Sequence, residues 1–392
     1  MDNDPSGTVP DSSGFHDNKE IYEELMALGR VAQAMDSFAG LASIEMQRWD
    51  RNLQTLSAKH KDLVISNSMY SLDNPSLIEA VHHNDMFLRS MLEWLSEEQG
   101  PFPLHKCLEA RDMWRMEHDT RVSPADFEKV VYVLKNVARD WSVEYREERE
   151  VSYGRICAEL DKAFSDSSDT PRVLVPGCGL ARLCLDIASR GFDVSGNEHS
   201  YFMLLTTAYF LNGLVTEHQW TVYPWVLQTS NMRSLEDQLR PISFPDVVPY
   251  DVMSTSRGSL SMLAGDFVEV FSSEDLKEYY NAVVTCFFLD TAHNVIEYME
   301  TIWDILQPDG VWIHFGPLQW HWADAHTYLP EEEVSIELPL DKVVEIAKNI
   351  GFVFDEDITE SISCPYMSAL NGMRPQVYDC AFWKARKPCA AE

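Results

Sequence analysis

The sequence lacks any apolar run that approaches the roughly 20 residues of a membrane-spanning helix, so no segment is expected to cross a membrane. Basic residues are also scarce: 31 Lys and Arg stand against 63 Asp and Glu in 392 residues, a formal net charge of -32. A field of that sign repels phosphate backbones and disfavours a nucleic-acid partner, whereas it favours a substrate that carries an amine. The N-terminus is acidic and has no apolar core, so no secretory signal is expected.

The cysteines never form a Cys-x-x-Cys pair, which leaves no support for a zinc framework, and a disulfide scaffold is not expected at this length. We therefore expect reduced thiols in a cytoplasmic protein. The acids and histidines between residues 290 and 326 lack the His-x-Asp/Glu motif of an iron site, so no metal ion is predicted.

The composition of the chain changes near residue 169. Residues 1–18 are rich in Asp, Ser, Gly and Pro and predict a disordered acidic tail, and helical periodicity then dominates in a region that we assign to 19–168. Across 169–392, short apolar runs alternate with helical stretches, which predicts an α/β domain with a mostly parallel sheet covered by helices. Within this domain, the proline-rich stretch at about 220–258 is interpreted as an insertion.

Several elements can be placed before the structure is considered. In one helix, Ser123 is predicted as the N-cap and Pro124 as the first residue, and Asn136 and Arg139 lie opposite its apolar stripe. Further helices are expected at 76–99, 180–190 and 201–214, and strands at 173–175, 192–195, 260–264, 282–289 and 311–315, with 352–354 and 377–385 as a closing pair.

The strongest local signal is a strand that runs into a glycine turn and then a helix. In this segment Gly177 and Gly179 allow a tight turn and a close approach of a ligand to the backbone. Glu198 follows Gly177 by 21 residues at the end of the next strand, where a carboxylate can accept hydrogen bonds from both ribose hydroxyls of a nucleoside cofactor. A dinucleotide fingerprint requires a small residue where Arg182 stands, so the pattern favours S-adenosylmethionine over NAD.

Three later strands each end in a polar residue, at the edge of the sheet where open α/β folds bind ligands. Asp266 and Phe267 suit the recognition of an adenine ring, although a loop acid beside a core aromatic explains them as well. Asp290 is placed to contact a substrate, with a helix N-cap as the alternative, and His321 lies in the same layer. His314 alternates inside a strand and is predicted to be packed in the core.

A set of motifs in a fixed order along the chain resembles the carnosine N-methyltransferase family. The segments that carry the resemblance are Val175–Arg182, Gly196–Glu198, Tyr223–Trp225, Gly265–Phe267 and Cys286–Asn294. The resemblance covers roughly residues 125–387 and implies a Rossmann-like, seven-strand, S-adenosylmethionine-dependent methyltransferase with an N-terminal helical extension. It implies N-methylation of the imidazole ring of carnosine, giving anserine, or of a related histidine-containing dipeptide.

The same resemblance implies roles for individual residues. Arg139 would bind the methionine carboxylate of the donor, because its planar fork matches that group. The donor site would contain Asn136, Arg139, Gly177, Glu198, Asp266, Phe267 and Cys286. The substrate-binding and catalytic residues would be Asp290, His321 and Tyr378.

The chain departs from the family pattern at several positions, including Cys178 where the glycine turn often carries Ala and Val175 where methyltransferase turns commonly carry an acid. Asn136 stands where the family carries Gln, Ala181 stands where it often carries Gly, and Gln376 replaces an aromatic residue two positions before Tyr378. The last departure leaves open a histidine-containing substrate other than carnosine.

Two other functions also remain open at this point. One is a methyltransferase of the same fold that acts on histidine in a protein or another peptide, and the other is a non-catalytic pseudoenzyme. The sequence also leaves open whether the protein forms a homodimer. It leaves open a nuclear location in addition to the expected cytoplasmic one.

Overall fold

The computed structural model of the protein describes residues 13–65, 74–97, 103–118, 120–325, 334–355 and 360–389. Its centre is an eight-stranded sheet with the order β5-β2-β1-β6-β7-β10-β8, in which β9 also pairs with β10, and β3 and β4 form a separate hairpin. The strands are β1 (Arg172–Pro176), β2 (Asp193–Glu198), β3 (Trp220–Val222), β4 (Ile242–Phe244), β5 (Ser259–Ala264), β6 (Tyr280–Cys286), β7 (Leu306–Gly316), β8 (Val353–Phe354), β9 (Glu360–Pro365) and β10 (Val377–Arg386). Within the described ranges, no helix combines the length and the apolar character needed to span a membrane.

The sheet is parallel from β5 to β7, and β10 runs antiparallel to β7, β8 and β9. From β1 the chain proceeds outward through β2 to β5, and then returns to the other side of β1 for β6 and β7. The strand order therefore reverses between β1 and β6, and the carboxyl ends of these strands form the edge at which open α/β sheets bind ligands. The predicted α/β, Rossmann-like fold class is confirmed.

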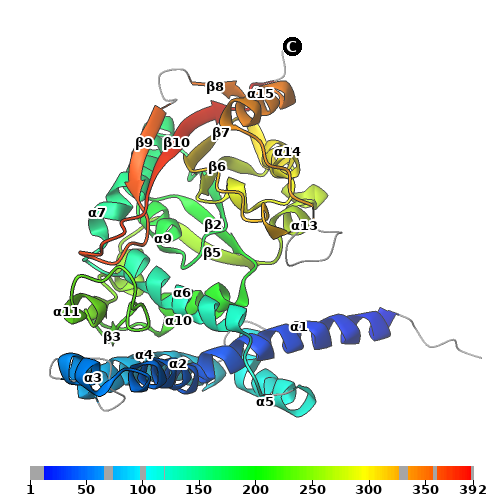
Figure 1. Ribbon diagram of the computed structural model, residues 1–392. Coiled ribbons are helices and arrows are strands. Elements are labelled where there is room, and N and C mark those ends of the chain that lie inside the picture. The colour runs from blue at the N-terminus through cyan, green and yellow to red at the C-terminus, as the bar shows by residue number, and fades with distance from the viewer. Residues whose placement is uncertain are drawn as a thin grey trace, which may run out of the picture.

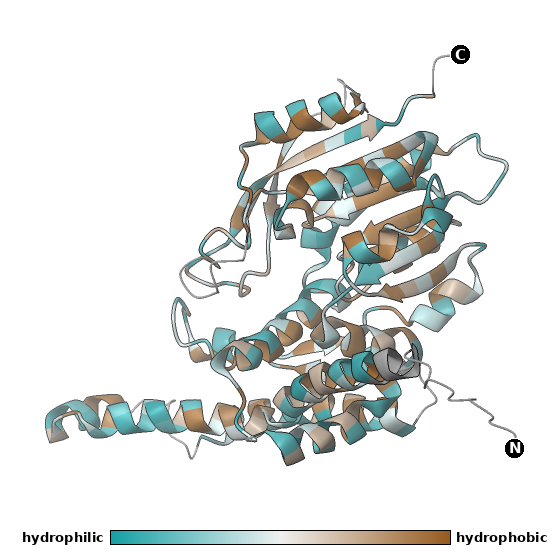
Figure 2. Cartoon of the chain, turned by 90° about the vertical axis from the view of Figure 1, so that its right-hand side faces the viewer, coloured by the Kyte–Doolittle hydropathy of each residue, from teal (hydrophilic) through white to brown (hydrophobic). Residues whose placement is uncertain are grey.

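Helices cover both faces of the sheet and also form a layer of their own below it (Figure 1). The longer ones are α1 (Ser13–Asp36), α2 (Phe38–Gln54), α3 (Ala58–Ile65), α4 (Pro75–Glu97), α5 (Cys107–Glu117), α6 (Pro124–Trp141), α8 (Arg155–Ala163), α10 (Tyr201–Gly213), α14 (Val295–Ile305) and α15 (Leu340–Ile350). The shorter ones are α7 (Arg146–Arg149), α9 (Arg182–Ala188), α11 (Leu235–Gln238), α12 (Pro249–Ser254) and α13 (Phe267–Phe271). Hydrophobic residues concentrate in the strands and on the helix faces turned toward them (Figure 2).

The central strands are apolar on both sides because both faces are covered. Val173 and Val175 of β1 pack with α8 and α9 on one face, while Leu174 between them packs with α14 on the other. In β7, Ile313 and Trp312 divide between the two faces in the same way. This alternation fixes the register of the parallel strands, since a shift by one residue would exchange the two faces.

The N-terminal helices share a hydrophobic core with the region after residue 169. The Phe87 ring on α4 lies 6.2 Å from Phe210 on α10 and 5.1 Å from Phe244 on β4, measured between ring centroids. Conversely, Ile156 of α8 packs into the core beneath the sheet. Hydrophobic packing therefore crosses the boundary that the sequence predicts, and α6 and α10 lie between the lower helices and the sheet (Figure 1).

The predicted elements mostly occur within a few residues of their expected bounds. The helix expected at 76–99 is α4, and Ser123 caps α6 as expected, accepting a hydrogen bond from the Asp126 N–H at 3.0 Å. The closing pair also forms, since Ala385 of β10 lies opposite Phe354 of β8. His314 is fully buried, and burial lowers the pKa of its imidazole to about 3.

Three features differ from the sequence-based expectations. Helix α1 begins at Ser13, inside the tail predicted at 1–18, whose first twelve residues lie outside the described ranges. The insertion contains the β3–β4 hairpin, whose two strands are separated by a long loop and so leave no short-range turn signal. Strand β9 was not expected, because its sequence Glu-Ser-Ile-Ser-Cys-Pro has few strong strand formers, yet it pairs with β10 over six residues.

A buried group of charges joins α6, α9 and the insertion. The carboxylate of Asp246 is fully buried and forms ion pairs with the guanidinium groups of Arg149, at 2.6 Å, and Arg182. Arg149 also donates to the Arg139 carbonyl at 2.6 Å and Arg182 donates to the Asp140 carbonyl at 2.9 Å, both near the C-terminal end of α6. Arg182 therefore fixes the last turn of α6 against the glycine turn. In the sequence, the size of this residue counts against binding of a dinucleotide cofactor.

Replacing Asp246 by Ala is expected to lower the free energy of unfolding by about 3–5 kcal/mol, because it leaves the buried Arg149 guanidinium without its carboxylate and Arg182 with Asp186 alone. Denaturant unfolding measures the change. Asp161→Ala is the matched control: it removes a carboxylate that pairs with Arg190 at the surface, where both side chains are more than 40% exposed, and is expected to cost less than about 1 kcal/mol. Equal losses in the two variants would contradict a structural role for the buried group.

Candidate active site

The glycine turn between β1 and α9 is closed by three residues in the left-handed backbone region. Gly177, Gly179 and Ala181 have φ values of 60°, 55° and 57°. A Cβ atom at residue 177 would lie 2.4 Å from the Phe288 ring, so no other residue type fits there without displacing that ring. Ala181 occupies the same conformation with a side chain, at a position where the backbone favours Gly.

Glu198 lies beside this turn at the end of β2. Its side chain is 9% exposed. One carboxylate oxygen accepts the Gly179 N–H at 3.0 Å, and the other accepts the N–H groups of His199 and Ser200 at 2.9 Å each. These three donors orient the carboxylate toward the turn. The structure therefore brings together the turn and the acid that the sequence placed 21 residues apart.

Asp266 and Phe267 follow β5, the next strand in the sheet. Asp266 is the N-cap of α13 and accepts the N–H groups of Val268 and Glu269. The Phe267 ring is buried and packs edge-on against Phe288 at 5.3 Å, behind the glycine turn. Capping and core packing account for both residues, and their part in binding adenine stays a prediction.

Arg139, Asn136 and Cys286 lie on the other side of the β1 end. The Arg139 fork binds the Asp140 carboxylate at 2.8 and 3.1 Å, and its guanidinium lies 5.2 Å from the Tyr366 ring centroid. Asn136 is buried, and its amide donates to the Tyr132 carbonyl on the same helix at 2.9 Å. Cys286 ends β6 half-buried, and burial raises the pKa of its thiol.

The three predicted substrate residues line one pocket of about 270 Å³. Asp290 lies in the short helix Leu289–Thr291 after β6, and burial raises the pKa of its carboxyl group. The Gln319 N–H donates to Asp290 Oδ2 at 2.9 Å, and the His321 N–H donates to the Asp290 carbonyl at the same distance. The Tyr378 hydroxyl donates to the Gln319 side chain, so Gln319 connects Tyr378 to Asp290, which in turn holds the His321 backbone.

We call this pocket the acceptor pocket, after the predicted substrate residues that line it. Two aromatic rings lie between it and a small cavity beside Arg139. Phe287 and Tyr366 line the acceptor pocket and also a small cavity that Arg139 lines. Their ring centroids are 4.6 Å apart, and the Tyr366 hydroxyl contacts that of Tyr132 at 3.1 Å. Arg139 thus lies on one side of these two rings, and the predicted substrate residues lie on the other.

Several pocket residues were missed by the sequence analysis. Tyr132 and Lys135 line the acceptor pocket from α6, and Gln319, Tyr366 and Gln376 line it from loops and strand ends. A signal for the first two was present, because Tyr132 and Lys135 each stand four residues before a predicted donor residue on the same helix. The loop residues have no comparable periodic signal.

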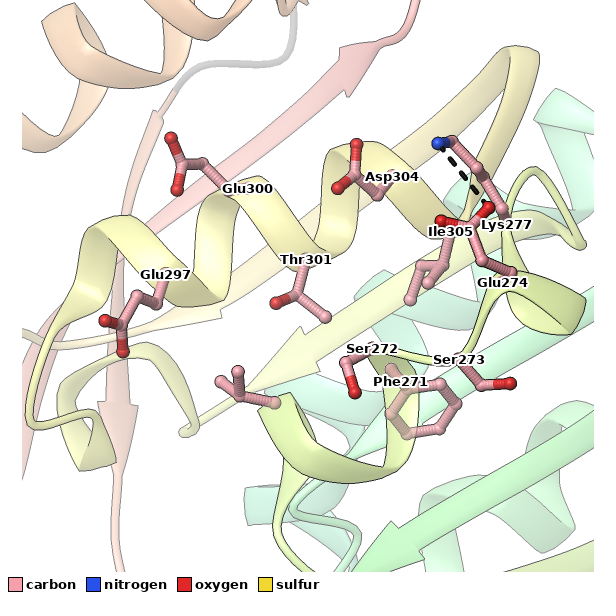
Figure 3. A pocket seen from close by; sticks show the side chains of 11 residues that line it. Phe271, Ser272, Ser273, Glu274, Lys277, Glu297, Glu300, Thr301, Asp304 and Ile305 are labelled. Carbon is pink, nitrogen blue, oxygen red and sulfur yellow. Dashed lines mark ion pairs between the residues drawn. The ribbon is translucent and has the colours of Figure 1, made fainter.

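A second hollow of about 280 Å³ lies between α13 and α14 and contains none of the predicted site residues. Figure 3 shows Glu297, Glu300 and Asp304 along α14, with Lys277 facing Glu274 at one end. The carboxylates make this hollow acidic, and it is separate from the acceptor pocket.

The strand order, the glycine turn after β1 and the carboxylate at the end of β2 define a Rossmann-like fold that suits a nucleoside cofactor, and the family model that matches the chain places it in the methyltransferase class. Within this class, the chain belongs to the carnosine N-methyltransferase family, whose model matches residues 116–389. Carnosine N-methyltransferase of Schizosaccharomyces pombe is 33% identical, covering 93% of this chain and 96% of that protein. The enzyme of that name in Rattus norvegicus is 32% identical, covering 98% of each chain. The resemblance seen in the sequence is confirmed.

Replacing Glu198 by Gln is expected to weaken the binding of S-adenosylmethionine by roughly 10–100-fold, because hydrogen bonds to a charged group contribute about 1.5–3 kcal/mol. Isothermal titration calorimetry measures the dissociation constant. The control is Glu269→Gln, since Glu269 is exposed on α13 and is not a predicted donor residue. An unchanged affinity in Glu198→Gln would remove Glu198 from the donor site.

Proposed function

We propose that this protein transfers a methyl group from S-adenosylmethionine to an imidazole nitrogen of carnosine, giving anserine, or of a closely related histidine-containing dipeptide. The observation that carries the proposal is the acceptor pocket, in which Asp290, His321 and Tyr378 converge beside Arg139 in a chain of this family. Its volume of about 270 Å³ suits a small peptide rather than a folded protein surface.

The residues around the glycine turn fit the proposed donor. Gly179 leaves its Cβ position open to close approach, since no atom lies within 4 Å of it, and Glu198 is held beside the turn as an acceptor for ribose hydroxyls. Arg139 is 13% exposed and would bind the methionine carboxylate, in exchange for part of its contact with Asp140. When bound, S-adenosylmethionine supplies a methyl group that is already activated on a sulfonium centre, so positioning of the acceptor provides much of the catalysis.

Asp290 is the proposed partner of the reacting ring. A neutral imidazole has one free lone pair, which attacks, and one N–H group. With Oδ2 occupied by the Gln319 N–H, Asp290 would accept the imidazole N–H through Oδ1. This contact fixes the tautomer and stabilises the positive charge that develops on the ring. Burial of the carboxyl group raises its pKa, which also makes it a better acceptor for that proton.

His321 and Tyr378 are the proposed orienting residues. The His321 backbone is fixed by the Asp290 carbonyl, and the Tyr378 hydroxyl is held between the side chains of Gln319 and Gln376. Gln376 thus provides a polar contact where the family carries an aromatic ring. This change supports the inclusion of related dipeptides in the proposed substrate range.

We further propose a cytoplasmic location, with the nucleus left open, because all eight cysteines are free thiols, as expected in a reducing compartment. The proposed partner is the small dipeptide itself.

The proposal predicts methyl transfer from isotope-labelled S-adenosylmethionine to carnosine. The acceptor panel contains carnosine, anserine, homocarnosine, Gly-His and free histidine, and the products are identified by mass spectrometry. Anserine should accept no methyl group, because its reactive nitrogen is already methylated. Binding of S-adenosylmethionine without transfer to any of these acceptors would contradict the proposal and direct the search to protein substrates. No binding of the donor would support a pseudoenzyme.

Replacing Asp290 by Asn is expected to lower kcat by about 10²–10⁴-fold, because the amide cannot stabilise the developing cation. The affinity for S-adenosylmethionine should not change. Steady-state kinetics and calorimetry measure the two quantities. Asp379→Asn is the matched control, since Asp379 is exposed on β10 and does not line the acceptor pocket. Near-wild-type turnover in Asp290→Asn would refute the assigned role.

A further inference from the structure

Lys135 is a partly buried cation without a carboxylate partner. In the part of the chain that the structure describes, no Asp or Glu forms an ion pair with its ammonium group, which instead lies 4.5 Å from the Trp225 ring centroid. Burial lowers the pKa of this lysine, and the more distant charge of Glu128 offsets only part of that effect. By contrast, the more deeply buried Lys384 and Lys387 both pair with carboxylates. A charge in this state favours a ligand that supplies the missing anion.

Lys135 is one of the residues that line the acceptor pocket. Lys135 lines this pocket from α6, together with Tyr132, whereas Asp290, His321 and Tyr378 line it from the ends of β6, β7 and the start of β10. One end of the pocket therefore suits an imidazole ring, and Lys135, on a different element, suits an anion. Asp290 is the only carboxylate among the lining residues, and its Oδ2 is already bonded to the Gln319 N–H.

We propose, on the basis of the function proposed above, that Lys135 binds the free carboxylate of the substrate's histidine residue. Carnosine carries this carboxylate on the carbon next to the imidazole side chain. An imidazole held by Asp290 would leave the carboxylate to the one lysine of the pocket, and an ion pair there offsets the desolvation of both charges.

This contact favours a peptide that ends in histidine. A terminal histidine carries the free carboxylate, whereas an internal histidine carries an amide in its place. A neutral amide cannot neutralise a partly buried ammonium group.

The insertion has a part in this selection. Trp225 belongs to it and is 3% exposed, and the Trp225 indole N–H donates to the Tyr145 hydroxyl at 3.2 Å. The ring is therefore fixed, and it holds the Lys135 ammonium by a cation–π contact while leaving hydrogen-bond donors of that group for the substrate.

The experiment compares two acceptors in three proteins. Carnosine is compared with β-alanyl-histamine, which is carnosine without the carboxylate, in the wild type, in Lys135→Met and in Lys129→Met. Methionine keeps much of the apolar stem and removes the charge. Lys129 is the matched control, because it is also on α6 and lies 5.8 Å from the Phe202 ring, but it is exposed and does not line the pocket.

In the wild type, kcat/KM should be roughly 10–100-fold higher for carnosine than for β-alanyl-histamine, as expected for a charged hydrogen bond. Lys135→Met should lose this preference through a higher KM for carnosine, with kcat and donor affinity nearly unchanged, and with little effect on β-alanyl-histamine. Lys135→Arg should restore part of the preference. Lys129→Met should behave as the wild type does.

The results separate the inference from the function on which it rests. Equal use of the two acceptors by the wild type would overturn the role of Lys135 while leaving carnosine methylation in place, and this comparison requires no variant to fold. An equal loss for both acceptors in Lys135→Met would also overturn it, because that result indicates a structural role. Failure of the wild type to methylate carnosine at all would overturn the proposed function and the inference together.

Discussion

The structure depends on one buried carboxylate. Asp246 in the insertion neutralises Arg149 and Arg182, and these two arginines bind carbonyl groups near the end of α6. The group therefore sets the position of α6 relative to the glycine turn, and α6 carries the predicted donor residues as well as Tyr132 and Lys135. A buried ion pair contributes little net stability compared with apolar packing, but its geometry is specific. Here that geometry determines where two halves of the site meet.

Helix α6 serves as a shared wall for the proposed donor and acceptor. Arg139 faces the small cavity behind Phe287 and Tyr366, whereas Lys135, one turn earlier, faces the pocket on the other side of these rings. Residues four apart on a helix lie on one face and about 6 Å apart along the axis. One rigid element thus sets the spacing between two anionic groups, the methionine carboxylate of the donor and the proposed carboxylate of the acceptor.

The residues predicted from the sequence lie where local patterns determine position. Gly177 and Asp290 each follow a buried apolar strand and Glu198 ends β2, and parallel strands bring their carboxyl ends to one edge whatever the loops between them. Lys135 and Tyr366 were not predicted, because a polar residue on a helix or in a loop has the same sequence pattern whether it faces water or a pocket. The position of Tyr366 depends on packing between α6, the insertion and β9, which no periodic signal reports, whereas Lys135 could be found only through its place one turn before Arg139.

The helices before the sheet also bear on how members of this family are recognised in genomes. The most distinctive motifs begin at Val175, so a gene fragment that starts after residue 168 would retain the glycine turn, Glu198 and the three predicted substrate residues. It would encode neither Arg139 nor Lys135, and the hydrophobic surface of α10 that packs on α4 and α6 would be exposed. Such a fragment would carry a family signature without the helix that closes the site. Conservation of α6 is therefore a better indicator of an active copy than the signature alone.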